Sequence, residues 1–385
     1  MRSRSENDEQ RAFRQSVRAF LTEKVAPHAE TWEREGLVPR SVYAGFGDLG
    51  VTGMQVPEAY GGGGQTSFAY NAILTEEIAA SGAATGALLL HLNVVLPYFL
   101  TYGTPEQLDR WCPGFVSGEL MTAIAMTEPG TGSDLAGITA TAVRDGDHYV
   151  LDGAKTFITG GVQADLVVVV ARTSRDAADR RGGLTLLVVE DGMPGFTRGR
   201  KLEKLGLRSQ DTAELFFDGV RVPVANRLGE EGGAFGYLGA NLSQERMAIA
   251  VGSQAACERA IALTLDYVRE RTAFGTPVAS FQNTKFVLAG LSARVAAGRQ
   301  LVDAALADLE DGVLSSADAA RTKLFTTELQ AEVVDACLQL HGGYGYMLEY
   351  PIARAYIDSR VRRIAGGSSE IMREIIGRSL FSAKK

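Results

Sequence analysis

The sequence predicts an α+β protein in which two helical domains flank a smaller β domain. Three observations support this order. Apolar residues recur at helical spacing through residues 1–121, short β-forming runs separated by turn residues fill 122–230, and the helical period returns over 231–385. The length of 385 residues also exceeds that of most single domains, so a division into domains is expected.

The N-terminal domain should contain four helical segments. In the first, five apolar residues recur at helical spacing: Phe13, Val17, Phe20, Leu21 and Val25. Further helices are expected at about 43–49, 68–81 and 87–100. Four consecutive glycines, Gly61–Gly64, predict a loop, because glycine stabilises neither helix nor strand.

The β domain is indicated by segments rich in β-branched and aromatic residues, at 148–159, 164–173, 183–195 and 213–223. Within them, Asp152-Gly153 and Asp218-Gly219 predict tight turns, since this dipeptide is common in hairpins. The C-terminal helices are expected at 235–272, as one very long helix or two joined, and at 285–310, 316–340, 352–361 and 371–380.

Composition excludes several classes of protein. The net charge of -7 argues against a nucleic-acid-binding protein, which would present a basic face. Three widely spaced cysteines, Cys112, Cys257 and Cys337, suggest neither a disulfide framework nor a metal site, and favour a reducing, cytoplasmic location. The N-terminus does not resemble a secretory signal, and no apolar run is long enough to predict a membrane span.

Four colinear motifs suggest a function. They are AMTEPGTGSD at 125–134, RERTAFGTPVASFQ at 269–282, QLHGGYGY at 339–346 and RRIAGGSSEIMRE at 362–374. Together they resemble the acyl-CoA dehydrogenase family across nearly the whole chain. The resemblance implies FAD as cofactor, a middle β-barrel or sandwich, a C-terminal four-helix bundle, a homotetramer, and an electron-transferring flavoprotein as electron acceptor.

The resemblance assigns one group of flavin-contacting residues to the β domain. Alone, the glycine-rich TEPGTGSD segment would more simply be a turn opening that domain. Beside the other motifs, its small residues allow close approach to a flat ring, and its hydroxyls can bind polar flavin edges. The implied flavin contacts are Ile124, Ala125, Met126, Thr127, Gly132, Ser133, Phe157, Ile158 and Thr159, with Thr159 near flavin N5.

A second implied group lies in the C-terminal domain. Arg271 would bind the FAD pyrophosphate, since a guanidinium offers paired donors to phosphate. Around it the resemblance places Phe274, Phe281 and Gln282. The family's Gln-to-Gly-Gly stretch reaches the FAD of a neighbouring subunit, and here it comprises Gln339, Leu340, His341, Gly342 and Gly343. Ser368, Ser369 and Glu370 complete the cofactor set, although the 339–343 and 368–370 stretches also suit helix ends and caps.

The catalytic base requires separate reasoning. Common family members carry a glutamate where this sequence has Gly366. A minority branch, including long-chain and isovaleryl-CoA dehydrogenases, places the base in a Glu-Arg pair on the long C-terminal helix, and Glu245-Arg246 matches that pattern. A helical glutamate is ordinarily a surface residue. Apolar neighbours predict partial burial here, which would raise the pKa of Glu245 toward a value useful for proton abstraction.

The predicted reaction is α,β-dehydrogenation of an acyl-CoA to a trans-2-enoyl-CoA, as in fatty acid metabolism. Gly366 would contribute its backbone N–H to the thioester oxygen, and Gly366→Glu is expected to restore part of the activity lost in Glu245→Gln. The implied substrate contacts are Ser133, Leu242, Arg246, Gly366 and Gly367. Three alternatives remain: desaturation of a carrier-protein-tethered acyl or aminoacyl thioester, a flavin oxidase or monooxygenase, and a non-catalytic flavoprotein.

Overall fold

The N-terminal part of the chain is helical. A computed structural model describes residues 5–83, 85–174 and 180–381. The N-terminal helices are α1 (Asp8–Phe20), α2 (Ala29–Glu35), α3 (Arg40–Asp48), α4 (Phe68–Ser81), α5 (Leu88–Leu90), α6 (Leu96–Tyr102) and α7 (Pro105–Ser117). The helix predicted at 68–81 is confirmed residue for residue. The helices α2 and α7 were not predicted, although a capping box of Thr104 and Gln107 marks the start of α7.

Two of the predicted helices contain π-helical turns. These turns are η1 (Leu21–Val25) after α1, and η4 (His91–Val95) between α5 and α6. Pro27 and Pro97 each follow such a turn by two residues. Proline has no N–H to donate, so the preceding turn cannot continue the regular hydrogen-bond ladder. The predicted helix at 87–100 therefore exists as a helical segment whose middle turn is wider than an α-turn.

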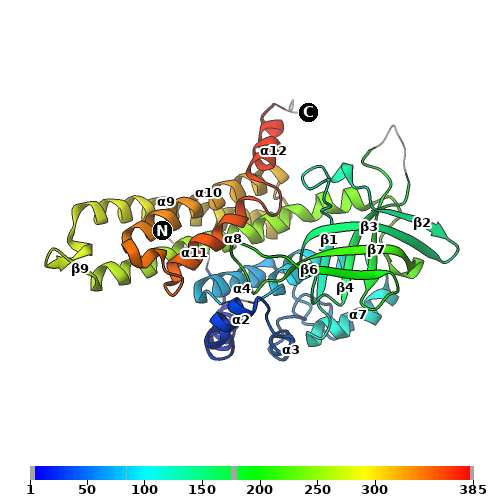
Figure 1. Cartoon of the computed structure of the whole chain (residues 1–385), viewed down its shortest axis with the longest axis horizontal. Coiled ribbons are helices and arrows are strands. Elements are labelled where there is room, and N and C mark those ends of the chain that lie inside the picture. Colours follow the sequence, from blue (N-terminus) through cyan, green and yellow to red (C-terminus); the bar gives the residue numbers. More distant parts are fainter. Residues whose placement is uncertain (1–4, 84, 175–179, 382–385) are drawn as a thin grey trace.

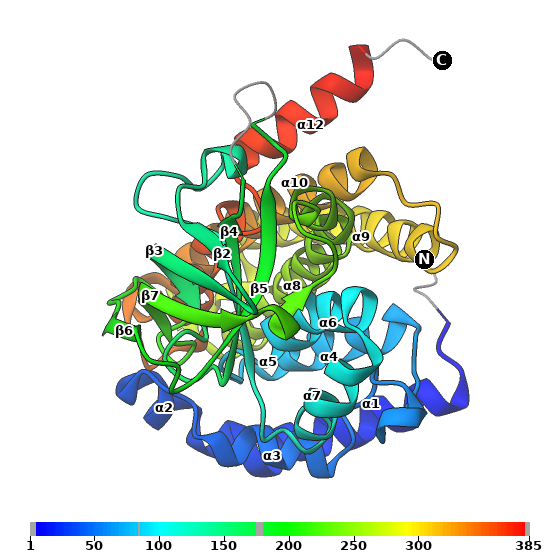
Figure 2. The same ribbon diagram turned by 90° about the vertical axis from the view of Figure 1, so that its right-hand side faces the viewer.

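The middle part of the chain forms a mixed sheet. Its strands are β1 (Thr122–Ala125), β2 (Thr141–Asp145), β3 (His148–Thr159), β4 (Leu166–Arg172), β5 (Leu184–Glu190), β6 (Phe196–Lys201), β7 (Thr212–Pro223) and β8 (Arg227–Leu228). They are ordered β6-β7-β3-β2-β4-β5-β8, and β1 pairs in parallel with β4. Figures 1 and 2 show this sheet at one end of the molecule, with the first helices along one side.

Strand β4 explains how the sheet joins the helical part. All seven of its residues are buried. Val168 and Val170 pack in the core shared with the N-terminal helices, whereas Val167 and Val169 pack in the sheet's own core. Successive residues of a strand point to opposite faces, so an uninterrupted apolar run is required here.

The two expected turns at Asp-Gly pairs are wrong. Strands β3 and β7 each run straight through their Asp-Gly pair, and the two strands pair with each other. The register shifts between Leu151 and Gly153, where Gly219 N–H donates to Asp152 Oδ1 at 2.8 Å. Both glycines have positive φ, 146° at Gly153 and 60° at Gly219. Each pair thus forms part of a β-bulge, which demands the same residues as a hairpin turn.

The C-terminal part is built around one very long helix. Helix α8 (Ala234–Glu270) is continuous over 37 residues, about 55 Å at the usual rise. It packs with α9 (Gln282–Glu310) and α10 (Ser316–His341), and α11 (Pro351–Ser359) and α12 (Ser369–Phe381) pack on α10. Figure 1 shows this bundle extending from the sheet to the opposite end, where the short strand β9 (Thr272–Ala273) lies. None of the described helices is long and apolar enough to cross a membrane.

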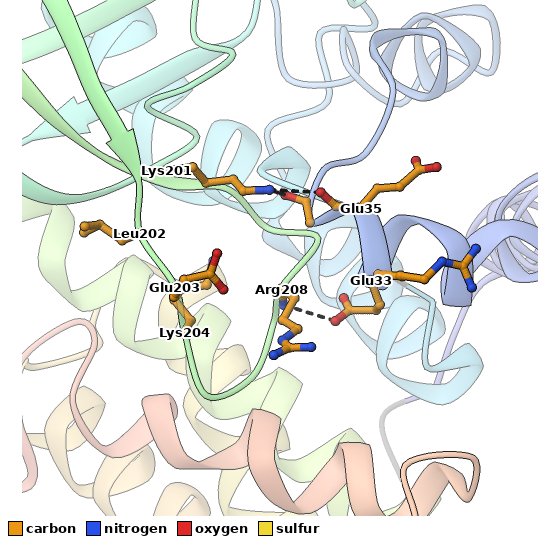
Figure 3. A pocket seen from close by; sticks show the side chains of 9 residues that line it. Glu33, Glu35, Lys201, Leu202, Glu203, Lys204 and Arg208 are labelled. Carbon is orange, nitrogen blue, oxygen red and sulfur yellow. Dashed lines mark hydrogen bonds between the residues drawn. The ribbon is translucent and has the colours of Figure 1, made fainter.

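The loop between β6 and β7 fastens the sheet to helix α2 (Figure 3). Lys201 Nζ donates to the carbonyls of Glu35 and Gly36 at 2.9 and 3.2 Å, where α2 ends. In return, Glu33 accepts from the backbone N–H groups of Arg208 and Ser209. Charged side chains line a cavity of about 120 Å³ between these elements. Because its ammonium group lies at the C-terminal end of α2, Lys201 also interacts favourably with the dipole of that helix.

The same loop is held on its other side by Asp358 of α11. Asp358 Oδ1 accepts from Leu207 N–H at 2.7 Å, and Leu207 has a φ of 49°. Burial raises the pKa of Asp358 to about 6, with Glu33 adding to the rise and Arg362 and Arg354 opposing it. Because the ordinary aspartate pKa is about 3.9, the folded protein binds more protons than the unfolded chain between these two pH values. Stability from this group therefore increases as pH falls through 6.

We expect Asp358→Asn to remove this pH dependence. The amide oxygen can still accept from Leu207 N–H, but it does not titrate. Between pH 7.5 and pH 5 the wild type should gain about 1 kcal/mol in free energy of unfolding relative to the variant. Urea unfolding at the two pH values measures this, with Asp311→Asn, at an exposed position, as the control. Equal changes in wild type and Asp358→Asn would contradict the prediction.

Candidate active site

A β-bulge in β3 presents Phe157 at the surface of the β domain. The pairing of β3 with β7 shifts register between Lys155 and Ile158, and Phe157 takes a φ of 59°. Its ring is 68% exposed. A bulky residue with positive φ is strained, and such strain concentrates at ligand sites. The structure therefore holds an aromatic ring in an accessible position at an energetic cost.

A buried ion pair fixes the segment beside Phe157. Lys155 is completely buried, and its Nζ donates to Met126 O at 3.0 Å and to Glu128 Oε1 at 2.9 Å. Glu128 also accepts from Thr139 N–H and Ala140 N–H. The Thr156 N–H donates to Thr127 O at 2.9 Å. The structure thus brings the 126–128 and 155–157 segments together, as the predicted site requires.

The hydroxyl groups of this region are free to bind a ligand. Within the described part of the chain, the side chains of Thr127, Ser133 and Thr159 make no hydrogen bond. Gly132 and Ser133 lie on an exposed loop. Three other predicted contacts are different, because their side chains are buried: Ile124, Ala125 and Ile158. Those three can reach a ligand only through their backbones.

The predicted base, Glu245, lies on α8 near the end of the bundle that adjoins the sheet. Its side chain is half-buried, and burial raises the pKa of Glu245, while Arg246 and Lys323 oppose the rise. No hydrogen bond or ion pair restrains the carboxylate within the described residues. Its neighbour Arg246 is buried and donates Nη1 to Ser316 Oγ at 3.1 Å. Glu245 is therefore a half-buried carboxylate whose oxygens accept no hydrogen bond from the described residues.

The turn between α11 and α12 brings Gly366 to Glu245. A Cβ atom built on Gly366 would lie 3.4 Å from Glu245 Oε1 and 2.5 Å from Ile249 Cδ1. The φ of Gly366 is 64°, which a residue with a side chain adopts at a cost. Among the described residues, no acceptor binds the Gly366 N–H. Glycine thus permits a close approach and leaves a free donor next to the carboxylate.

The Ser368–Glu370 segment acts mainly as a helix cap. Met372 N–H donates to Ser368 O, and Ser369 Oγ donates to Glu328 Oε1 at 2.7 Å. Ser369 is buried, so its hydroxyl is already engaged, whereas Glu370 is exposed. The cap interpretation therefore explains Ser368 and Ser369, and the described contacts of these two serines include none that points to a cofactor.

The second predicted group lies at the other end of α8. Arg271 stands over the ring of Tyr344 at 5.5 Å, and Tyr267 stacks on His341 with centroids 4.2 Å apart. These contacts bring the 271–282 and 339–343 segments together. Phe274, Gln282, Gln339, Gly342 and Gly343 are exposed, Phe281 and Leu340 are half-buried, and His341 is buried.

Within one chain, the predicted cofactor residues of the β domain and those of the C-terminal domain lie far apart. Arg271 follows Glu245 by 26 positions, about 39 Å along α8. Figure 1 shows the β9 region and the sheet at opposite ends of the long axis. The predicted cofactor residues therefore form two clusters in one chain, one on the sheet and one at the β9 end of α8.

Two buried lysines were missed by the sequence reasoning. Lys155 lies within the predicted strand at 148–159, and Lys323 lies within the predicted helix at 316–340. Lys323 is completely buried and donates Nζ to Gly367 O at 2.5 Å. Its flanking sequence, AARTKLFTT, offers a weak signal, because Lys323 lies among small and apolar residues. Such a lysine is normally assigned to solvent.

Comparison with known proteins identifies the class. The chain matches models of the acyl-CoA dehydrogenase N-terminal domain over 7–119, the middle domain over 123–220 and the C-terminal domain over 233–381. It therefore belongs to the acyl-CoA dehydrogenase family, whose members are FAD-dependent oxidoreductases that dehydrogenate acyl-CoA. The family and the three-part fold predicted from the sequence are confirmed.

Individual relatives cover nearly the whole chain. The rat (Rattus norvegicus) mitochondrial long-chain specific acyl-CoA dehydrogenase is 45% identical over 370 residues, 96% of this chain and 86% of that protein. The crystal structure of an acyl-CoA dehydrogenase from Geobacillus kaustophilus is 46% identical, with a TM-score of 0.96 and coverage of 99% and 100%. A glutaryl-CoA dehydrogenase from Mycobacterium smegmatis, in complex with FADH2, is 28% identical, with a TM-score of 0.89 and coverage of 98% and 95%.

Proposed function

We propose that this chain oxidises an acyl-CoA thioester to a trans-2-enoyl-CoA, with Glu245 as the catalytic base and FAD as the hydride acceptor. The observation that carries the proposal is the position of Glu245. Among the described residues it is a half-buried carboxylate without a hydrogen-bond partner, and its Oε1 lies 3.4 Å from where a Gly366 side chain would begin. A thioester placed beside both residues would have a base near Cα and an N–H donor near its carbonyl oxygen.

Glu245 and Gly366 would have complementary roles in one proton transfer, the first as the base and the second as a hydrogen-bond donor to the thioester oxygen. Abstraction of a Cα proton by Glu245 moves negative charge onto the thioester oxygen. The free N–H of Gly366 can stabilise that charge, and a preformed donor is worth most where water is excluded. Burial raises the pKa of Glu245, which makes the carboxylate a stronger base than an exposed one. Arg246, held by Ser316, opposes this rise in the pKa of Glu245.

The accessible side chains of the β domain fit a flavin. Phe157 offers an exposed ring, and Thr127, Ser133 and Thr159 offer free hydroxyls. When bound, the flavin would accept the hydride that leaves Cβ. Leu242, Ser133 and Gly367 would contact the substrate.

A second chain would complete the cofactor site. Arg271, Phe274, Phe281, Gln282 and the 339–343 segment lie too far along α8 to meet Phe157 of the same chain. We infer that they serve the FAD of a neighbouring subunit, in a homotetramer. An electron-transferring flavoprotein would then remove the electrons, and a cytoplasmic location suits the three buried free cysteines.

Anaerobic titration of the FAD-bound protein with acyl-CoAs of increasing chain length tests this function. We expect the visible flavin absorbance to bleach with at least one acyl-CoA, because substrate oxidation reduces the flavin. Bleaching only by a carrier-protein thioester would indicate that the substrate is a carrier-protein-tethered acyl or aminoacyl group, as in secondary metabolism. Rapid reoxidation by O₂ would indicate an oxidase or monooxygenase, and no bleaching by any thioester would indicate a non-catalytic flavoprotein.

A further inference from the structure

Lys323 reaches the active-site turn from the middle of α10. Its side chain is completely buried, and Nζ donates to Gly367 O at 2.5 Å. Fully buried lysines are rare, because an ammonium group loses its hydration on burial. Burial here lowers the pKa of Lys323 to about 8. A role in helix packing alone would be filled at lower cost by an apolar side chain.

The hydrogen bond restrains the most flexible part of the turn. Gly366 and Gly367 have φ values of 64° and 94°, and neither has a side chain with which to pack. Helix α10 holds the turn at a second point, where Glu328 accepts from Ser369 Oγ and from Arg363 Nη1. Lys323 is the contact that acts directly on the glycines. Without it, the position of the Gly366 N–H relative to Glu245 would depend on the contacts of Glu328 with Arg363 and Ser369 on either side of the glycines.

Lys323 also contributes charge to the same place. The groups that face Glu245 are Arg246 on its own helix, Lys323 on α10 and Tyr98 on α6. Both cations favour the ionised form of Glu245, against the burial that disfavours it. Glu328 and Glu245 in turn favour the charged form of Lys323, while Arg246 opposes it. Lys323 thus offsets part of the desolvation of the proposed base.

We propose that Lys323 is a positioning residue for this reaction: it fixes the Gly366–Gly367 turn over the substrate oxygen and places a positive charge close to Glu245. The inference rests on the proposed function of Glu245. It assigns Lys323 no direct contact with the substrate. The two effects are separable, because one depends on the hydrogen bond to Gly367 and the other on the positive charge.

Three variants separate these effects from general stability. Lys323→Met removes the bond and the charge, and Lys323→Arg keeps the charge. Lys204→Met is the matched control, because Lys204 is a partly buried lysine of the β6–β7 loop that donates to Gln210 O and Thr212 Oγ1. All three are checked for folding by thermal unfolding. Anaerobic stopped-flow flavin reduction by an acyl-CoA is then measured from pH 5.5 to 9.

Lys323→Met should move the acidic limb of the rate profile upward by about one pH unit, since loss of a nearby cation raises a carboxylate pKa. Its limiting rate should fall about tenfold or more, because the N–H donor is no longer held. Lys323→Arg should return the limb to its wild-type position. Lys204→Met should match the wild type in both quantities. A folded Lys323→Met with wild-type limb and rate would overturn the proposal.

A second measurement follows proton abstraction without hydride transfer. Acetyl-CoA has Cα hydrogens but no Cβ, so its exchange with deuterium in D₂O reports proton abstraction alone. We expect slower exchange in Lys323→Met than in Lys204→Met, and equal exchange in the two variants would contradict a role for Lys323. If Glu245→Gln exchanges and reduces flavin like the wild type, the base assignment itself fails. If Glu245→Gln is inactive but Lys323→Met is normal, only the present inference fails.

Discussion

Glu245→Gln is expected to bind acyl-CoA normally and to lose flavin reduction by about 10³- to 10⁴-fold, the upper range for removal of a general base. Glutamine keeps the size and most of the polarity of the side chain, so the space beside Gly366 should not change. It cannot accept the Cα proton. The position at which common family members carry their base holds no carboxylate here, because it is Gly366. Stopped-flow reduction under nitrogen and calorimetric titration of an acyl-CoA measure the two quantities.

The control for Glu245→Gln lies on the same helix. Glu258→Gln changes a carboxylate of α8 that accepts hydrogen bonds from Arg299 and Gln254, away from the turn at Gly366. It should reduce flavin at the wild-type rate even if it is less stable. A Glu245→Gln variant that reduces flavin within tenfold of the wild type would show that another group removes the proton. Weak acyl-CoA binding by Glu245→Gln would instead assign the residue to substrate binding.

The position of the proposed base could be predicted from sequence because two patterns pointed to it. The Glu-Arg pair occupies a helix with apolar neighbours, and Gly366 lacks a carboxylate. The structure adds a steric reason for that glycine, since a Cβ there would lie 2.5 Å from Ile249 Cδ1. The expected rescue of Glu245→Gln by Gly366→Glu stays a prediction, but it now requires Ile249 to move and a glutamate to adopt positive φ.

Other features could not be predicted, for identifiable physical reasons. An Asp-Gly pair is compatible with a β-bulge as well as with a hairpin turn. At Asp152-Gly153 and Asp218-Gly219 the pairing of β3 with β7 determines that a bulge forms, and this pairing cannot be read from the local sequence. The separation of Arg271 from Phe157 depends on α8 continuing unbroken, which the helical period left open. Lys323 and Lys155 were overlooked because sequence alone assigns charged residues to the surface. Burial of such residues depends on partners that lie far away in the chain.

Lys155→Met should lower the free energy of unfolding by about 3–5 kcal/mol, the usual cost of removing one member of a buried ion pair. Lys155 is completely buried and Glu128 nearly so, so neither charge is well hydrated. The variant should also release FAD more readily, because Lys155 holds Met126 O beside Phe157. Urea unfolding and the recovery of flavin fluorescence on dilution measure the two effects. Lys24→Met, at an exposed lysine, is the control and should change stability by less than about 1 kcal/mol.

The decrease in free energy of unfolding in Lys155→Met will show which contacts stabilise the Glu128 carboxylate. Its carboxylate also accepts from Thr139 N–H, Thr139 Oγ1 and Ala140 N–H, so three donors remain when Lys155 is removed. These contacts and Lys155 hold the pKa of Glu128 below its ordinary value against the effect of burial. Its contribution to stability is therefore present above that ordinary pKa and is lost as pH falls through the lowered one. A loss below about 1 kcal/mol in Lys155→Met would mean that the donors of Thr139 and Ala140 are sufficient to stabilise Glu128. A loss of the expected size, together with acid unfolding at a higher pH than in the wild type, would mean that the charge of Lys155 is needed to hold the 126–128 segment in place.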